Sequence, residues 1–186
     1  MSVDLLVGST GFVGGNLAAK HTFAAACHSS DIAAQYGTRP ELCVYAGVPA
    51  AMFLANADPE ADLAVMRAAR ENLRRIAPKE LVLISSIAVW PDSRGKYEDD
   101  TPLPDGLPAY GKNRLQLENW VREDFPKALI VRLPALYGAG LKKNCIIRYR
   151  MRYYQQTPGH QQTGGCICRK IKCGKIIADQ RADEPE

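Results

Sequence analysis

Short apolar runs, most of them closed by a glycine, a serine or a proline, recur along the first 134 residues. Runs of this kind are typical of strands that are buried in a parallel sheet. They lie at residues 3–7, 23–27, 42–46, 81–84 and 128–132. Between them, apolar residues at helical spacing predict helices over residues 12–20, from about 58 to 76 and from about 110 to 122.

This alternation predicts an α/β fold, in which a doubly wound parallel sheet lies between two layers of helices. In such a sheet, ligands bind in the crevice beyond the carboxyl ends of the strands. Gly8, Ser86 and Pro134 each lie just beyond a predicted strand, so we expect them at this edge. Residues 91–108 are rich in proline and acidic residues, which predicts an irregular loop.

The charge balance changes near residue 141. Residues 1–141 carry 14 Lys and Arg against 16 Asp and Glu, whereas residues 142–186 carry 10 against 4 and hold four of the six cysteines. A length of 186 residues suits one principal domain and is short for a nucleotide domain with a full substrate domain. We therefore predict one folded domain over residues 1–141 and a basic, cysteine-containing tail over residues 142–186.

The tail allows three interpretations. Cys166, Cys168 and Cys173 suggest zinc, but their spacing is not that of a paired C-x₂-C site, so no metal is expected. The basic, tyrosine-containing stretch 148–152 suggests nucleic acid, which is not expected as a partner either. The abrupt change in composition fits best a truncated or frame-shifted gene product with a poorly ordered end.

The sequence does not predict a membrane protein. No run of about 18 apolar residues is present, and the early Asp4 without a cationic leader does not resemble a signal peptide. The cysteine spacing is not that of a secreted disulfide framework, so we expect reduced thiols and a cytoplasmic location.

A glycine-rich turn links the first predicted strand to the first predicted helix. Its sequence is G-x-x-G-x-x-G, made of Gly8, Ser9, Thr10, Gly11, Phe12, Val13 and Gly14. The first glycine allows a tight turn, the second lets main-chain N–H groups approach a pyrophosphate, and the third lets helix and strand pack closely. The position of the motif favours a dinucleotide, either NAD or NADP, over the alternative of a merely tight connection.

The end of the second predicted strand bears on the choice of cofactor. Asp31 is placed to bind a ribose 2′-hydroxyl as in NAD enzymes, whereas His28, Ser29 and Ser30 are suited to surround the 2′-phosphate of NADP. Asp31 can equally be the N-cap of a helical turn at residues 32–36. The sequence leaves these alternatives open.

Five strings in this order resemble the extended short-chain dehydrogenase/reductase family, the NAD-dependent epimerase/dehydratase group. They are GSTGFVGGNL, VYAG, LVLISSIAVW, AYGKNRLQLE and VRLPALYG, and the resemblance stops at Leu141. It implies a Rossmann-type, three-layer fold with a truncated substrate lobe. It also implies an NAD(P)-dependent oxidoreductase, epimerase or dehydratase that acts on a hydroxyl or carbonyl of a small molecule, with nucleotide sugars among the candidates.

The resemblance implies three residues that act on the substrate. Tyr110 matches the family's acid/base and Ser86 the hydroxyl that hydrogen-bonds the same substrate oxygen. A phenol is a poor base at neutral pH unless a cation lies nearby. The family has lysine four residues after the tyrosine, on the same helix face, where this chain has Arg114. An arginine keeps the charge but cannot relay a proton.

Further positions follow from the same resemblance. Ala46 and Gly47 match small residues beside the cofactor, and Ser85 and Pro134 lie where the family contacts it. The family's helical asparagine maps to Asp62, with Asn72 as an alternative that is more typical of an exposed helix residue. These departures support a rival hypothesis, a non-catalytic dinucleotide-binding protein or truncated family member. The family often forms homodimers through helices that correspond to residues 58–76 and 110–122.

Overall fold

The computed structural model describes residues 3–138 and residue 141. The chain divides into two units, Met1–Asn144 and Cys145–Glu186, and only the first contains described residues. The predictions for the cysteines and the basic stretch of the tail therefore lie outside the described residues. The boundary at residue 141 stays a prediction.

Five strands and the helices between them follow the order expected from the sequence. The elements are β1 (Asp4–Val7), α1 (Phe12–Ala18), β2 (Ala25–Cys27), η1 (Ile32–Gln35), β3 (Leu42–Tyr45), α2 (Met52–Ala57), α3 (Pro59–Ile76), β4 (Glu80–Ser86), η2 (Ile87–Val89), α4 (Ala109–Asp124) and β5 (Leu129–Leu133). Each predicted strand and helix is confirmed. Helix α2 and the short helix η2 were not predicted.

The strands form one sheet in the order β2-β1-β3-β4-β5, and every neighbouring pair is parallel. The chain leaves β1 for β2 on one side and returns to β3 on the other side of β1. The topological switch point therefore lies between β1 and β3, which is where open α/β sheets bind ligands. Val7 and Tyr45 are paired at its carboxyl edge.

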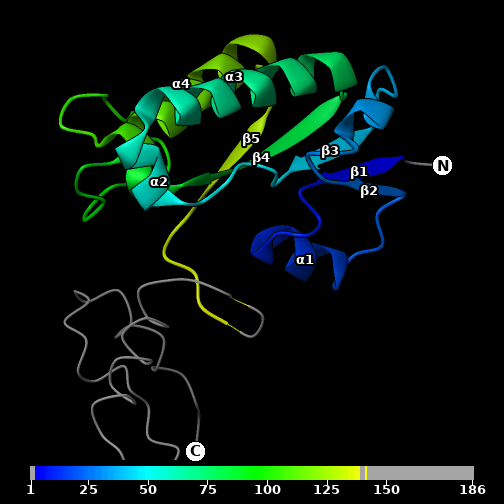
Figure 1. The fold of residues 1–186 in the computed structure, drawn as a ribbon, viewed down its shortest axis with the longest axis horizontal. Coiled ribbons are helices and arrows are strands. Elements are labelled where there is room, and N and C mark those ends of the chain that lie inside the picture. Colours follow the sequence, from blue (N-terminus) through cyan, green and yellow to red (C-terminus); the bar gives the residue numbers. More distant parts are fainter. Residues whose placement is uncertain (1–2, 139–140, 142–186) are drawn as a thin grey trace, which may run out of the picture. The chain divides into compact units, whose positions relative to one another are not determined.

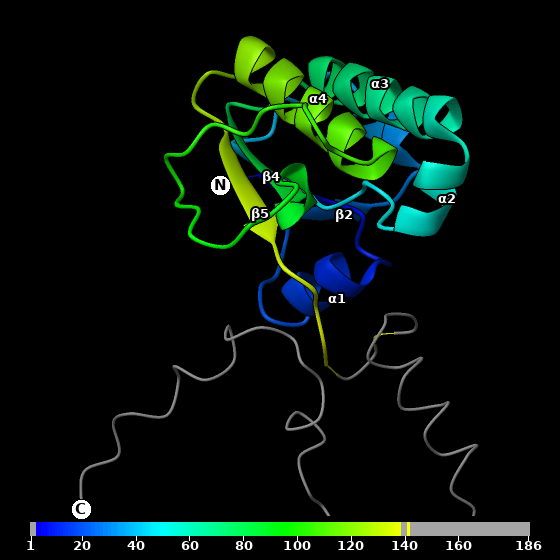
Figure 2. The ribbon, with the colours of Figure 1, turned by 90° about the vertical axis from the view of Figure 1, so that its left-hand side faces the viewer.

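The sheet separates helix α1 from helices α3 and α4 (Figures 1 and 2). The main core lies between the sheet and α3 and α4. It contains Leu5, Val7, Cys43, Tyr45, Leu81 and Leu83 from the strands, and Met66, Leu73, Ile76, Leu117 and Val121 from the helices. The odd-numbered residues of β1 share this core because side chains alternate between the two faces of a strand. In the described part of the chain, no helix is long and apolar enough to cross a membrane.

Local sequence explains the bounds of α3. The Asp58 carboxylate accepts from the Ala61 N–H at 3.0 Å, and Pro59 occupies the first turn, where no hydrogen bond to its nitrogen is needed. The helix ends at Ala77, which has a left-handed φ of 53°. Its long amphipathic run then packs Met66, Leu73 and Ile76 into the core.

Helix α4 approaches the segment after β4 very closely at Gly111. A Cβ atom built on Gly111 would lie 2.1 Å from the carbonyl oxygen of Ala88 in η2. Since Tyr110 precedes Gly111 and Ser86 immediately precedes η2, this contact brings the two predicted site residues to the same place.

We predict that Gly111→Ala destabilises the domain by about 1–3 kcal/mol or more, because a methyl group cannot fit beside the Ala88 carbonyl. Urea unfolding followed by circular dichroism measures the change. Lys112→Ala, at the exposed neighbouring position, is the control and should change stability by less than about 0.5 kcal/mol. Equal stability of the two variants would contradict the close contact.

Candidate functional site

The glycine turn forms the floor of the crevice at the switch point. Gly8 has a φ of 91°, which favours glycine, and a Cβ atom there would lie 2.5 Å from the carbonyl oxygen of Ala46. A Cβ atom on Gly14 would lie 2.1 Å from the carbonyl oxygen of Gly8. Main chain therefore packs directly on main chain, as the sequence motif predicted for Gly8 and Gly14.

The end of β2 is joined to this turn. The carbonyl oxygen of Cys27 accepts from the backbone N–H groups of Gly8 and Ser9, at 2.8 and 3.2 Å, and the Ser9 hydroxyl donates to it at 3.3 Å. Burial, and to a smaller extent the charge of Asp31, raises the pKa of the Cys27 thiol to about 11. The thiol is therefore neutral at physiological pH and adds no negative charge beneath the turn.

The residues proposed to select the cofactor form a small network after β2. The Asp31 carboxylate accepts from the His28 backbone N–H at 2.7 Å, and the Ser30 hydroxyl lies 2.9 Å from Nδ1 of His28. Asp31 precedes η1, but its side chain does not cap that helix, so the N-cap alternative is wrong as regards the carboxylate. Ser29 lies exposed between these residues.

Small residues occupy the other side of the crevice, after β3. The Ala46 N–H donates to the carbonyl oxygen of Val7 at 2.8 Å, which continues the β1–β3 pairing beyond the strands. A Cβ atom on Gly47 would lie 3.0 Å from Cγ1 of Val7. Ala46 and Gly47 thus lie beside the glycine turn, where a larger side chain would fill the crevice.

The two serines that end β4 have different partners. The Ser86 hydroxyl accepts from the Ala88 N–H at 3.1 Å, which leaves its own hydrogen to donate. The Ser85 hydroxyl instead donates to the Glu118 carboxylate at 2.6 Å. Ser86 is therefore the better placed of the two to donate a hydrogen bond to a ligand.

Tyr110 is buried at the start of α4. Its backbone N–H donates to the side-chain oxygen of Asn56, at the end of α2, at 2.9 Å. The guanidinium carbon of Arg114 lies 4.3 Å from the centre of the Tyr110 ring. Arg114 therefore lies beside Tyr110, as the spacing on the helix predicted, and it does so as a cation stacked on the ring.

Arg114 and Asp62 are partners. The guanidinium donates to the Asp62 carboxylate at 2.7 Å and to the carbonyl oxygen of Pro49 at 2.6 Å. Asn113 donates to the same carboxylate oxygen at 2.9 Å. Only 4% of the Arg114 side chain and 10% of the Asp62 side chain are exposed. The two charges therefore compensate each other in a buried pair. Both residues of this pair stand at positions where the sequence departs from the family pattern.

The remaining predicted residues lie outside the contacts described above. Asn72 is half-buried and accepts from the Tyr36 hydroxyl at 2.7 Å, so the expectation of an exposed helix residue is wrong. It lies on α3 and contacts Tyr36, which follows η1. Pro134 directly follows β5 and is exposed. Thr10, Gly11, Phe12 and Val13 lie in the glycine turn and the first turn of α1.

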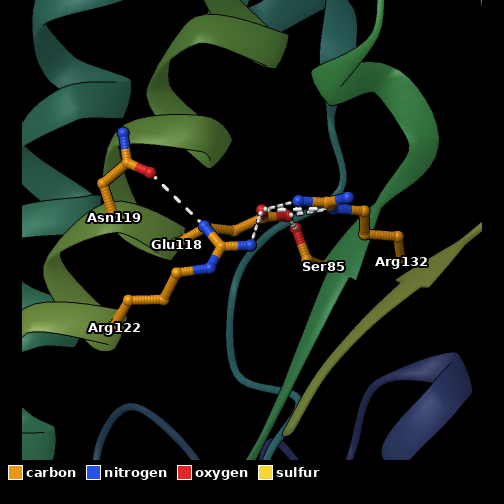
Figure 3. A network of polar contacts seen from close by, with 5 residues as sticks. All are labelled: Ser85, Glu118, Asn119, Arg122 and Arg132. Carbon is orange, nitrogen blue, oxygen red and sulfur yellow. Dashed lines mark hydrogen bonds and ion pairs between the residues drawn. The ribbon is translucent and has the colours of Figure 1, made fainter. Parts of the chain in front are cut away.

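Sequence reasoning missed a polar network beside the site, drawn in Figure 3. Glu118 on α4 is completely buried, and its carboxylate accepts from Ser85, Arg122 and Arg132. The sequence offered two signals for this network, the charged Glu118 on the inner face of a predicted helix and the charged Arg132 in an apolar strand. Asn56 and Asn113 gave no signal at all.

The described residues contain no group of three or more His, Cys, Asp or Glu side chains that could hold a metal ion. The Ser86 hydroxyl keeps its hydrogen to donate, so the end of β4 suits a ligand with a carbonyl oxygen.

A glycine turn at the switch point of a parallel sheet, with a serine and a tyrosine beyond it, places the chain among the Rossmann-type α/β proteins. The sequence matches the RmlD substrate binding domain family over residues 4–157, and the chain belongs to this family. The match runs past residue 141, where the resemblance had been expected to stop. No curated protein matches the chain in sequence.

Solved structures share this fold. One is dTDP-4-dehydrorhamnose reductase from Bacillus anthracis in complex with NADP, with 18% identity and a TM-score of 0.66 over 85% of this chain and 62% of that one. RMD from Pseudomonas aeruginosa complexed with NADPH has 20% identity and a TM-score of 0.65, over 84% and 60% of the two chains.

UDP-glucuronic acid 4-epimerase from Bacillus cereus in complex with NAD has 16% identity and a TM-score of 0.62, over 83% of this chain and 63% of that one. The chain thus spans about three fifths of the length of these relatives. The resemblance to the extended short-chain dehydrogenase/reductase family is confirmed.

We predict that Asp62→Ala lowers the free energy of unfolding by about 3–5 kcal/mol, because the buried Arg114 charge loses its partner. Urea unfolding at pH 7 tests this. Asp92→Ala is the matched control, since it breaks an ion pair with Arg94 in which both side chains are exposed, and stability should hardly change. Similar losses in both variants would contradict the buried pair.

Proposed function

We propose that this chain is the dinucleotide-binding part of an NAD(P)-dependent oxidoreductase that acts on a carbonyl or hydroxyl group. One observation carries the proposal: the glycine turn lies at the switch point of the sheet, and Ser86 and Tyr110 each adjoin the close contact between Ala88 and Gly111. The residues at the turn fit a dinucleotide, because Gly8 and Gly14 allow the close main-chain packing of the G-x-x-G-x-x-G motif and place no side chain at the turn. An enzyme of the family needs both the dinucleotide site at the turn and the hydroxyl groups of Ser86 and Tyr110.

The cofactor is NAD or NADP. The structural relatives are named as complexes with NADP, NADPH and NAD, so the family uses both dinucleotides. In this chain, the main-chain N–H groups of Thr10, Phe12 and Val13 would hold the diphosphate, since those of Ser9 and Gly11 already donate to the carbonyl groups of Cys27 and Gly8. The network of His28, Ser30 and Asp31 would face the adenosine ribose. Ala46 and Gly47 keep the crevice open.

When bound, the reduced nicotinamide supplies the hydride that a carbonyl carbon accepts. Ser86 donates a hydrogen bond to the carbonyl oxygen, and Tyr110 gives its phenolic proton to the same oxygen, so that a ketone becomes an alcohol. The reverse direction takes the proton back from the alcohol. Arg114 adds a positive charge at the ring.

Nucleotide sugars are the substrate class that we propose. The support is the family, together with relatives that act on dTDP- and UDP-linked sugars. The rival function is a dinucleotide-binding protein without catalysis. The two hydrogen bonds that Arg114 already makes to Asp62 and Pro49 favour this rival.

Calorimetric titration with NADPH and NADH tests the cofactor proposal. We expect binding by the wild type and by Gly15→Ala, because a Cβ atom on Gly15 would lie 3.5 Å from the nearest atom, an ordinary contact. Gly14→Ala should lose binding at least tenfold, since its Cβ would displace the Gly8 carbonyl. Failure of a correctly folded wild type to bind either dinucleotide would refute the proposed function.

The full-length chain with NADPH and a dTDP-linked 4-keto sugar tests the catalytic part. We predict that Tyr110→Phe removes turnover at least a hundredfold and leaves the dissociation constant of NADPH within about twofold, because only the proton donor is lost. Loss of absorbance at 340 nm measures turnover. Turnover unchanged in this variant would exclude Tyr110 as the acid/base, whereas dinucleotide binding without turnover by the wild type would support the non-catalytic rival.

A further inference from the structure

Helix α4 carries two carboxylates that each hold an arginine against a tryptophan. Near the site, Glu118 binds Arg132, whose guanidinium carbon lies 5.8 Å from the centre of the Trp90 ring. At the far end of the helix, Asp124 binds Arg70, which lies 5.3 Å from the centre of the Trp120 ring. The two triads use the same kinds of interaction, but only the first adjoins the crevice.

Glu118 is held more tightly than a surface pair would be. Its carboxylate is completely buried, and Arg132 donates to it from both Nε and Nη2, at 3.2 and 2.8 Å. Such a two-point contact fixes the plane of the guanidinium as well as its distance. The Ser85 hydroxyl donates to the other carboxylate oxygen at 2.6 Å, as Figure 3 shows. The position of the carboxylate therefore determines the positions of both donors.

Those two donors lie side by side at the edge of the sheet. Ser85 of β4 and Arg132 of β5 are register partners, one position before Ser86 and Leu133. Ser86 is the proposed hydrogen-bond donor to the substrate. Trp90 follows η2, and Arg132 stacks on its ring. One side chain of α4 is thus connected to both segments that line this end of the crevice.

We propose that Glu118 is a positioning residue for the nicotinamide end of the crevice. From inside α4 it fixes the position of Ser85 and, through it, that of the neighbouring Ser86. It also fixes the position of Arg132 and, through the ring contact, that of Trp90, so that this end of the crevice keeps its shape. This inference rests on the proposed function for the identity of the ligand. Glu118 acts through its partners and does not touch the ligand.

The two tryptophans of the chain make a direct test possible. In a Trp120→Phe background, Trp90 is the single tryptophan, and its ring contacts Arg132 of the near triad and, at 5.1 Å, Lys96, which all variants keep. Glu118→Gln is compared with Asp124→Asn, which removes the remote ion pair of Asp124 on α4 with Arg70 on α3. Each variant is titrated with NADPH and with ADP, which lacks the nicotinamide half and probes only the glycine-turn end.

We expect Glu118→Gln to shift the Trp90 emission to longer wavelength and to raise its acrylamide quenching constant at least twofold, because Arg132 leaves the ring. Its affinity for NADPH should fall at least fivefold, while its affinity for ADP stays within twofold of the wild type. Asp124→Asn should change thermal stability and none of these quantities. A merely structural role would lower stability in both variants and leave the ratio of NADPH to ADP affinity unchanged.

If Glu118→Gln fails to fold, Ser85→Ala takes its place, because it removes one hydrogen bond and leaves the ion pair intact. The variant should weaken NADPH binding and spare ADP binding. The proposal is overturned if the replaced residue leaves both the Trp90 fluorescence and the affinity ratio at wild-type values, or if Asp124→Asn changes them equally. If the folded wild type binds neither dinucleotide, the proposed function fails. The Trp90 emission and quenching alone then decide whether Glu118 fixes the positions of Arg132 and Trp90.

Discussion

Direct packing of main chain on main chain at the carboxyl end of β1 is the constraint on which the site depends. Gly8 approaches the Ala46 carbonyl, and Gly14 approaches the Gly8 carbonyl, at distances that a Cβ atom cannot tolerate. The Cys27 carbonyl accepts from the N–H groups of Gly8 and Ser9 and so joins the turn to β2. Three strands therefore meet at a turn in which main-chain groups, rather than side chains, face the crevice.

The reacting groups depend on how α4 is fixed above this floor. Gly111 allows the helix to touch η2, and the Asn56 side chain accepts from the backbone N–H group of Tyr110. The buried charges of α4 are compensated, Arg114 by Asp62 and Glu118 by Arg132, because an unpaired charge in the interior would be costly. The same contacts that stabilise the domain therefore define where Tyr110 and Ser86 lie.

Much of this could be predicted from local pattern. The strands are apolar runs with defined ends, and the glycine turn follows from its spacing and its place between strand and helix. Helix α2 was missed because its six residues place three large apolar side chains in succession, all exposed, and bury only Ala55, so they show no helical periodicity.

The polar partnerships depend on tertiary contact and could not be predicted. Asp62 and Arg114 were each noticed as an unusual residue, yet they lie 52 positions apart. Only packing of α3 against α4 makes them a pair. Glu118 and Arg132 likewise lie on different elements, and neither residue type indicates by itself that it is buried.

The most direct test of the central claim is an amide NMR titration of the labelled chain with NADPH. The account predicts that the backbone N–H resonances of Thr10, Phe12 and Val13 shift most, because these groups contact the diphosphate, whereas the N–H groups of Gly8, Ser9 and Gly11 already donate to carbonyl groups of the protein. If NADPH binds while these resonances stay in place and others move, the glycine turn is not the phosphate site and the account is wrong.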